Sequence, residues 1–156
     1  MDRIDKEILA LLQENADLPI NEISERVNLS TTPCWRRIQR LQDAGYIQRK
    51  VVLLDPEKLN VGVTVFVVLR TNQHNQEWFE RLSATVREIP EVVDFYRMSG
   101  NIDYLLRVVV PDIAAYDEVY KRLTKKIEIF EVSSSFAMEE IKHTTSLPLD
   151  YLDRGN

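Results

Sequence analysis

The segment from Ser30 to Leu41 constrains the fold most, because it has the pattern of a short helix with two unlike faces. Ser30 is a favourable N-cap residue, since its hydroxyl can accept a hydrogen bond from an unpaired amide of the first turn. Pro33 lies within that first turn, where a missing N–H costs little. Three apolar residues at positions i, i+4 and i+7 share the face that packs inward. They are Cys34, Ile38 and Leu41.

Arginine side chains occupy much of the remaining surface of this helix. Arg36 and Arg40 stand opposite the apolar face, and Arg37 lies on its flank. A helix that packs on one side and offers three guanidinium groups on the other suits the groove of a polyanion. A solvated, charged helix surface explains the arginines alone equally well, so the neighbouring segments decide between the two interpretations.

The segments before this helix predict two more helices. Asp2 is a favourable cap for the first of them, and Pro19 ends its pattern. The apolar stripe of the first helix is Ile4, Ile8, Leu11 and Leu12. A short second helix is predicted at 20–27, and residues 28–30 form a tight turn into the arginine helix. This arrangement is typical of a helix-turn-helix domain, which favours DNA binding over a merely solvated surface.

The residues after the third helix add positive charge. Glycine is the usual residue just past a helix end, so Gly45 ends the helix. Residues 46–54 are rich in β-formers and predict a wing strand, with Gln48, Arg49 and Lys50 near the phosphates. The chain has a net charge of −5, but residues 30–50 hold five basic residues and one acidic residue, a local net charge of +4. Because phosphate binding responds to local potential, we expect DNA binding that depends on a dimer or larger assembly.

Length and composition set the class of protein. A chain of 156 residues can form one full domain or two small ones. It lacks the apolar run of roughly 18 residues that a transmembrane helix needs, and its charged first residues differ from a signal peptide. One cysteine excludes an internal disulfide and fits a reducing compartment. We therefore expect a cytoplasmic protein that does not bind membranes.

The second half of the chain has a different pattern. The irregular segment 51–62, which contains Pro56 and Gly62, predicts a linker between a domain at 1–50 and a domain at 63–156. In the second domain we expect strands at 63–70, 92–98, 103–110 and 132–143, and helices at 76–88 and 113–126. The order βαββαβ is that of the ferredoxin-like fold. The predicted fold class is α+β, a winged helix-turn-helix domain joined to a ferredoxin-like domain.

Both helices of such a fold cover one face of the sheet and leave the other face open. The helix at 113–126 is predicted to point Ile113, Tyr116, Tyr120 and Leu123 inward. The first strand offers two alternating sets for the open face, Val63/Val65/Val67/Leu69 and Thr64/Phe66/Val68, and either is too apolar for water. An exposed apolar sheet face predicts a partner, most simply a second copy of the chain.

The sequence contains no convincing catalytic or metal-binding set. His74 and His143 have no cysteine or carboxylate at ligand spacing, which argues against a metal site. Cys34 lies on the apolar stripe of its helix, so a packed, inert thiol is favoured over a nucleophile or a redox sensor. The chain has only four glycines and no glycine-rich phosphate loop. We therefore expect neither an enzyme nor a protein with a metal or cofactor.

Four separated motifs carry a resemblance to a known family. Residues 30–38, STTPCWRRI, resemble the S-x-T/S-P-C-x-x-R core, followed by an apolar residue, of the Lrp/AsnC regulators of bacteria and archaea. Residues 2–9 resemble that family's first helix, and residues 99–106, SGNIDYLL, its G-x-x-D-Y-L-L segment. Residues 138–142 with 144–148 resemble its last strand and tail. The motifs occur in the family's order and cover nearly the whole chain.

The resemblance implies an amino-acid effector bound between dimers, near the G-x-x-D loop and the facing part of the last strand. Carried onto this chain, the effector-binding residues are Met98, Gly100, Asn101, Asp103 and Ser135. A carboxylate can hold an α-ammonium group, and free backbone amides beside a glycine can hold an α-carboxylate. The pattern of the loop alone favours a plain β-turn. Residues 126–131 lack the Pro-Gly turn of many family members, which leaves open the geometry of this turn and any contact that it makes between dimers.

The resemblance also implies a transcription regulator that binds double-stranded DNA and assembles as dimers and octamers, each octamer being a tetramer of dimers. The predicted DNA-binding residues are Ser30, Thr31, Thr32, Arg36, Arg37 and Arg40. Thr31, Thr32 and Arg36 are expected to meet base edges or nearby phosphates, whereas Arg37 and Arg40 hold the backbone. The alternative is a ferredoxin-like domain that binds small molecules and whose helical half makes only protein contacts.

Overall fold

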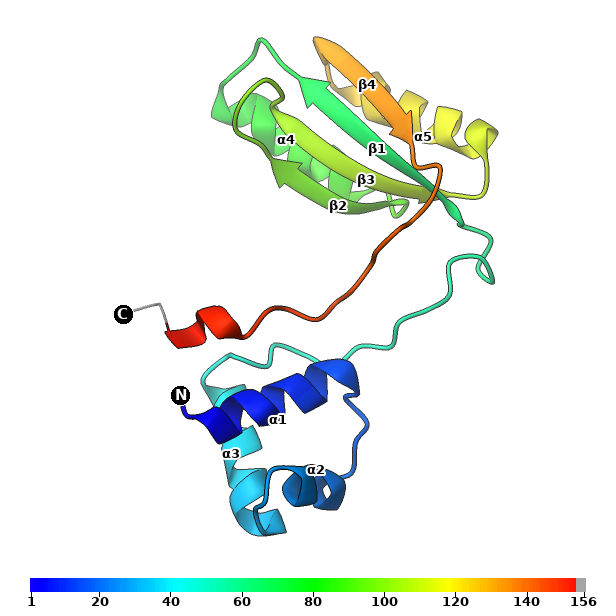
Figure 1. Ribbon diagram of the computed structural model, residues 1–156. Coiled ribbons are helices and arrows are strands. Elements are labelled where there is room, and N and C mark those ends of the chain that lie inside the picture. Colours follow the sequence, from blue (N-terminus) through cyan, green and yellow to red (C-terminus); the bar gives the residue numbers. More distant parts are fainter. Residues whose placement is uncertain (154–156) are drawn as a thin grey trace. The chain divides into compact units, whose positions relative to one another are not determined.

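A computed structural model describes residues 1–153, which fold as two compact units (Figure 1). The helical unit holds the chain as far as Val52 together with the C-terminal segment from Lys142. The sheet unit holds Leu53–Ile141. The chain therefore enters the sheet unit once and returns to the helical unit at its end, whereas the sequence predicted a second domain that runs from 63 to 156.

Three helices build the helical unit, α1 (Arg3–Glu14), α2 (Ile20–Arg26) and α3 (Thr31–Asp43). Asp2 caps α1 as predicted, and its side chain accepts a hydrogen bond of 2.8 Å from the amide of Asp5. The buried core of the unit is Ile8, Leu9, Ile23, Val27, Cys34 and Leu41. The apolar face predicted for α3 is thus confirmed, with Ile38 packed at its border.

Ser30 is the N-cap residue of α3 as predicted, but its side chain makes no capping hydrogen bond. The predicted wing strand was wrong. Residues 46–54 form no strand, because a strand needs a neighbouring strand and no described segment of the chain pairs with them. Gly45 ends α3 as expected, with a φ of 77° in the left-handed region.

The C-terminal segment packs on the helical unit. The side-chain amide of Gln13, on α1, pairs with the backbone of Leu147: Nε2 donates to the carbonyl at 3.0 Å and Oε1 accepts from the amide at 2.9 Å. Leu149 and Leu152 then pack against the helical core, the latter within a short 3₁₀ helix, η1 (Asp150–Asp153).

The sheet unit has the predicted βαββαβ order. Its elements are β1 (Val63–Arg70), α4 (Gln76–Arg87), β2 (Val92–Arg97), β3 (Tyr104–Val110), α5 (Ile113–Lys126) and β4 (Glu131–Phe136). The strands form one antiparallel sheet in the order β2-β3-β1-β4, and both helices lie on the same face of it (Figure 1). This is the ferredoxin-like topology expected from the sequence.

Alternation along β1 decides which face of the sheet is open. Val65, Val67 and Leu69 are buried beneath the helices. Phe66 points the other way and remains well exposed, so the open face carries the set Thr64/Phe66/Val68. Of the two alternatives left by the sequence, the structure selects the second.

Two predictions for the sheet unit need correction. β4 ends at Phe136 rather than at 143, because its partner β1 begins at Val63 and the pairing closes when the amide of Ala137 donates to Thr64. The inward residues of α5 are Tyr116, Val119 and Leu123. Ile113, predicted to point inward, is 70% exposed because it lies at the first position of the helix, where the sheet does not cover it. Tyr120 is likewise exposed.

Candidate DNA-binding surface and effector loop

The outward surface of α3 is a stripe of four side chains at positions i, i+3, i+4 and i+7. They are Thr32, Trp35, Arg36 and Gln39. Trp35 is 54% exposed, which is unusual for the largest apolar side chain, and Thr31 is exposed beside it. Sequence reasoning did not include Trp35, although its helical spacing from Thr32 and Arg36 was sufficient to place it on this surface.

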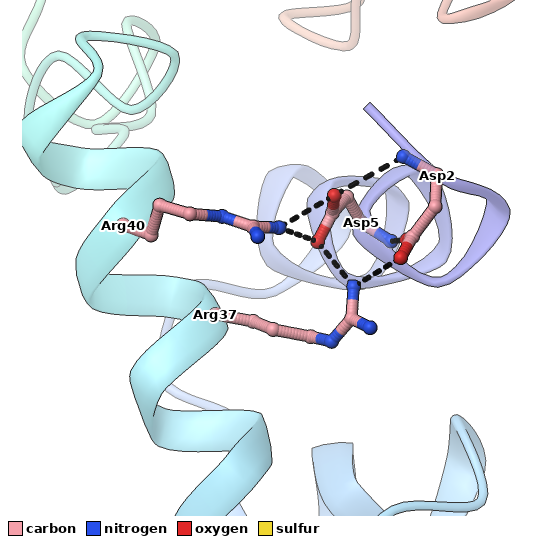
Figure 2. A network of polar contacts seen from close by, with 4 residues as sticks. All are labelled: Asp2, Asp5, Arg37 and Arg40. Carbon is pink, nitrogen blue, oxygen red and sulfur yellow. Dashed lines mark hydrogen bonds and ion pairs between the residues drawn. The ribbon is translucent and has the colours of Figure 1, made fainter.

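Arg37 and Arg40 turn away from this stripe toward the start of α1 (Figure 2). Arg37 Nη1 lies 2.9 Å from Asp5 Oδ1 and 2.5 Å from Asp2 Oδ2. Arg40 Nη2 donates to both carboxylate oxygens of Asp5 at 2.7 Å. Asp5 is only 2% exposed, so it is a buried carboxylate between two guanidinium groups.

The contacts in this cluster favour the charged forms of Asp2 and Arg37. The backbone amide of Asp5 and then the guanidinium of Arg37 lower the pKa of Asp2 below its usual value. The hydrogen bonds to Asp2 and Asp5 raise the pKa of Arg37. Two carboxylates and two guanidinium groups leave the cluster with little net charge. Among residues 1–153, Arg36 is the arginine of α3 that makes no ion pair or hydrogen bond.

Cys34 lies on the opposite, inward face of α3 and is completely buried. Burial raises the pKa of its thiol, so the protonated form predominates at neutral pH. This environment suits a packing role and opposes nucleophilic chemistry. The described part of the chain also brings no three His, Cys, Asp or Glu side chains together as a metal site.

The predicted effector loop connects β2 and β3. Gly100 has a φ of 102°, which favours glycine, and Met98 and Asn101 are exposed beside it. The carbonyl of Asp103 accepts from the amide of Met98 at 2.8 Å and closes the loop. The carboxylate of Asp103 accepts from the amide of Thr71 at 2.8 Å, which fastens the loop to the residue that follows β1.

Ser135 lies on β4, apart from this loop. It pairs with Phe66, whereas Leu69, three residues further along β1, pairs with Tyr104 beside the loop. In addition, β4 borders β1 on the side away from β3. A single chain therefore brings Met98, Gly100, Asn101 and Asp103 together but leaves Ser135 outside the group. Thr71 was missed by sequence reasoning, because only the fold brings its amide to Asp103.

Family models match both units. The model described as winged helix-turn-helix DNA-binding covers residues 1–48, and the Lrp/AsnC ligand binding domain covers residues 64–147. The chain belongs to the Lrp/AsnC family of transcriptional regulators. Membership supports the DNA-binding regulator over the alternative of a helical half that makes only protein contacts.

Individual Lrp/AsnC relatives are similar to this chain over nearly its whole length. The chain is 51% identical to the DNA-binding transcriptional activator DecR of Escherichia coli K12, over 96% of this chain and 99% of the relative. A crystal structure of an AsnC family transcriptional regulator from Agrobacterium tumefaciens has 62% identity and a TM-score of 0.94, covering 97% of this chain and 99% of that one. A transcriptional regulator of Neisseria meningitidis, solved in complex with L-Met, has 40% identity, the same coverage and a TM-score of 0.92.

Proposed function

We propose that this Lrp/AsnC protein reads a specific DNA sequence through the exposed stripe of α3 and that an amino acid regulates it. The observation that carries the proposal is the unpaired guanidinium of Arg36, which stands beside Thr32 on the outward face of a helix-turn-helix domain. A recognition helix of such a domain lies in the major groove, and arginine can donate two hydrogen bonds to guanine there. Thr31 and Thr32 contact base edges or nearby phosphates.

The assigned DNA-binding residues contribute unequally in this proposal. Ser30 lies at the start of α3, where its side chain makes no capping bond and is available to the DNA. Arg37 and Arg40 approach the DNA backbone only as far as their ion pairs with Asp2 and Asp5 permit. Two copies related by a two-fold axis bind half-sites about 34–36 Å apart, so the operator is pseudo-palindromic.

The effector in this proposal is an amino acid bound at the loop of Met98, Gly100, Asn101 and Asp103. The relative solved with L-Met supports an amino-acid ligand. The α-ammonium group pairs with the carboxylate of Asp103, and loop amides beside Gly100 hold the α-carboxylate. Ser135 comes from a second copy, because one chain does not bring it to the loop. Ligand binding between copies shifts the assembly, proposed to be an octamer built as a tetramer of dimers, and thereby changes DNA affinity.

No described helix is long and apolar enough to span a membrane. We assign the protein to the cytoplasm, where it acts on chromosomal DNA as a regulator rather than an enzyme.

DNA binding across a salt series, with and without each of the twenty amino acids, tests the proposed function. The probe is the operator selected by the purified protein from genomic fragments. We expect tight binding that weakens steeply with salt, since phosphate contacts release counterions, and a change in affinity with one or a few amino acids. Failure to select any fragment would contradict the DNA-binding proposal, and selection without any amino-acid response would contradict the effector proposal.

Asp103→Asn separates the charge of this side chain from its hydrogen bond. The amide oxygen of asparagine can still accept from Thr71, so the loop keeps its anchor, but the charge that pairs with an α-ammonium group is lost. We expect operator affinity without effector to stay within twofold, whereas the amino-acid response is abolished. Asp94→Asn, which removes a carboxylate from the same sheet, is the control and keeps the response. A full response in Asp103→Asn would refute this placement of the effector.

A further inference from the structure

Two of the three arginines on the recognition helix are held by one buried carboxylate. From this arrangement we propose that Asp5 is a positioning residue that restrains Arg37 and Arg40, limits sequence-independent affinity for DNA and so raises specificity. The inference rests on the proposed DNA-binding function. It assigns a DNA-related role to a residue of α1 that lies outside the recognition helix.

The geometry of Asp5 leaves little of its carboxylate free. Oδ1 contacts Arg37 Nη1 at 2.9 Å and Arg40 Nη2 at 2.7 Å. Oδ2 accepts from Arg40 Nη2 at 2.7 Å and from the amide of Asp2 at 3.2 Å. Figure 2 shows both guanidinium groups reaching from α3 to the N-terminal end of α1, where the two aspartates lie. The carboxylate therefore fixes the direction of both arginine side chains.

A DNA phosphate and the carboxylate of Asp5 compete for the same guanidinium donors. Both anions bind guanidinium through charge-assisted hydrogen bonds of similar geometry. The carboxylate is part of the same chain, so its local concentration is high. Because Asp5 is buried, withdrawal of one arginine leaves its carboxylate with a single guanidinium partner, and withdrawal of both leaves it with none, which is strongly unfavourable. Exchange of either arginine onto a phosphate is thus opposed.

The restraint of Arg37 and Arg40 by Asp5 lowers mainly the sequence-independent affinity for DNA. Phosphate contacts supply nearly all non-specific affinity, whereas base contacts carry the sequence information. The three arginines of α3 carry the same charge, yet Arg37 and Arg40 are paired with Asp5, whereas Arg36 in the exposed stripe makes no ion pair within residues 1–153. With fewer phosphate contacts, the ratio of operator to random-sequence affinity increases.

The test compares wild type with Asp5→Asn on random-sequence duplex DNA and on the operator, from 50 to 200 mM salt. Each arginine released onto a phosphate steepens the slope of log K against log salt by about 0.9, which is about a 3.5-fold greater loss of affinity across this range. We expect a steeper slope for Asp5→Asn and a smaller ratio of operator to random-sequence affinity. Asp17→Asn removes the same charge from an exposed position of the helical unit that makes no ion pair within residues 1–153, and its slope should equal that of wild type.

Two further variants keep the inference falsifiable. Arg37→Gln/Arg40→Gln in the Asp5→Asn background should return the slope to the wild-type value, because the released arginines cause the change. Arg40→Gln with Asp5 intact should lower the slope by well under about 0.9, because the ion pair with Asp5 limits the contact of Arg40 with a phosphate. This result is informative even if Asp5→Asn does not fold. A slope that falls by about 0.9 in Arg40→Gln would overturn the inference, since Arg40 would already contact a phosphate.

The remaining outcomes separate this inference from the proposed function. If wild type binds DNA and folded Asp5→Asn has the wild-type slope, the inference about Asp5 is overturned and the proposed function stands. If the triple variant keeps the steep slope of Asp5→Asn, the effect does not come from Arg37 and Arg40, and the inference is also overturned. If wild type binds no duplex at any salt concentration, both are overturned.

Discussion

Arg36 and Trp35 are neighbours on α3 with exposed side chains, and Arg36 is the arginine of this helix that is available for base contacts. An arginine that donates to guanine contributes about 1–3 kcal/mol of discrimination. We therefore expect Arg36→Ala to weaken operator binding by about 1–3 kcal/mol and random-sequence binding much less. Fluorescence anisotropy with labelled duplexes measures both.

Arg26→Ala is the matched control for this prediction. Arg26 lies on α2, is exposed and pairs with Glu22 within its own helix, so its removal takes away the same charge without touching the stripe. Its operator affinity should change little. Equal losses on operator and random-sequence DNA for Arg36→Ala would show that Arg36 binds phosphate and reads no base.

The sequence predicted the faces of Arg36 and Arg37, but it placed Arg40 opposite the apolar face with Arg36, whereas the Arg40 side chain turns toward the start of α1. It predicted no ion-pair partner for Arg37 or Arg40. Helical spacing placed Arg36 outward and Arg37 on the flank of the apolar face. The ion pairs of Arg37 and Arg40 depend on Asp2 and Asp5, which precede them by more than thirty residues and meet them only when α1 packs on α3. A partner this distant along the chain is a tertiary contact, and local pattern contains no signal for it.

The helices and strands were predicted where periodicity alone decides them. α5 begins and ends at the predicted residues, and the alternation along β1 correctly divided its residues between the two faces of the sheet. The errors concern strands whose length depends on a neighbour: β4 ends opposite the start of β1, and residues 46–54 have no described partner. β-propensity indicates which residues tolerate an extended backbone, whereas pairing determines whether they form a strand.

The attachment of the C-terminal segment to α1 gives an element-level prediction. The amide of Leu147 donates to Gln13 Oε1, and the Leu147 carbonyl accepts from Gln13 Nε2. Gln13→Ala removes both bonds, so we expect faster hydrogen exchange in residues 142–153 and little change in the sheet unit. A net intramolecular hydrogen bond contributes about 1 kcal/mol, so the loss of two bonds should accelerate exchange at Leu147 roughly thirtyfold.

Gln76→Ala is the control for this experiment. Gln76 also makes a side-chain hydrogen bond at an exposed surface, to Glu80, but it belongs to α4 in the sheet unit. Exchange in residues 142–153 should be unaffected. Unchanged protection in Gln13→Ala would mean that Leu149 and Leu152 hold the segment by packing alone.

The open face of the sheet predicts where a second copy of the chain binds. Phe66 is 39% exposed at the centre of β1, and the partly buried Val68, Leu105 and Val109 share its face. An antiparallel sheet exposes one face to water only when that face is polar, so an apolar face favours burial against a second copy. A dimer formed through this face supplies the two-fold symmetry that a pseudo-palindromic operator requires.

Phe66→Glu tests this assembly. A carboxylate at this position loses its hydration on burial against a second copy, and Arg107, opposite Phe66 on β3, is already paired with Asp94. We therefore expect the variant to be monomeric in light scattering coupled to size exclusion. Its operator affinity should fall at least tenfold, because each half-site then binds alone. Tyr120→Glu is the control: Tyr120 is also 39% exposed but lies on α5, on the opposite side of the sheet. A dimeric Phe66→Glu would show that the copies associate through another surface, and a monomeric Tyr120→Glu would place that surface on the helices.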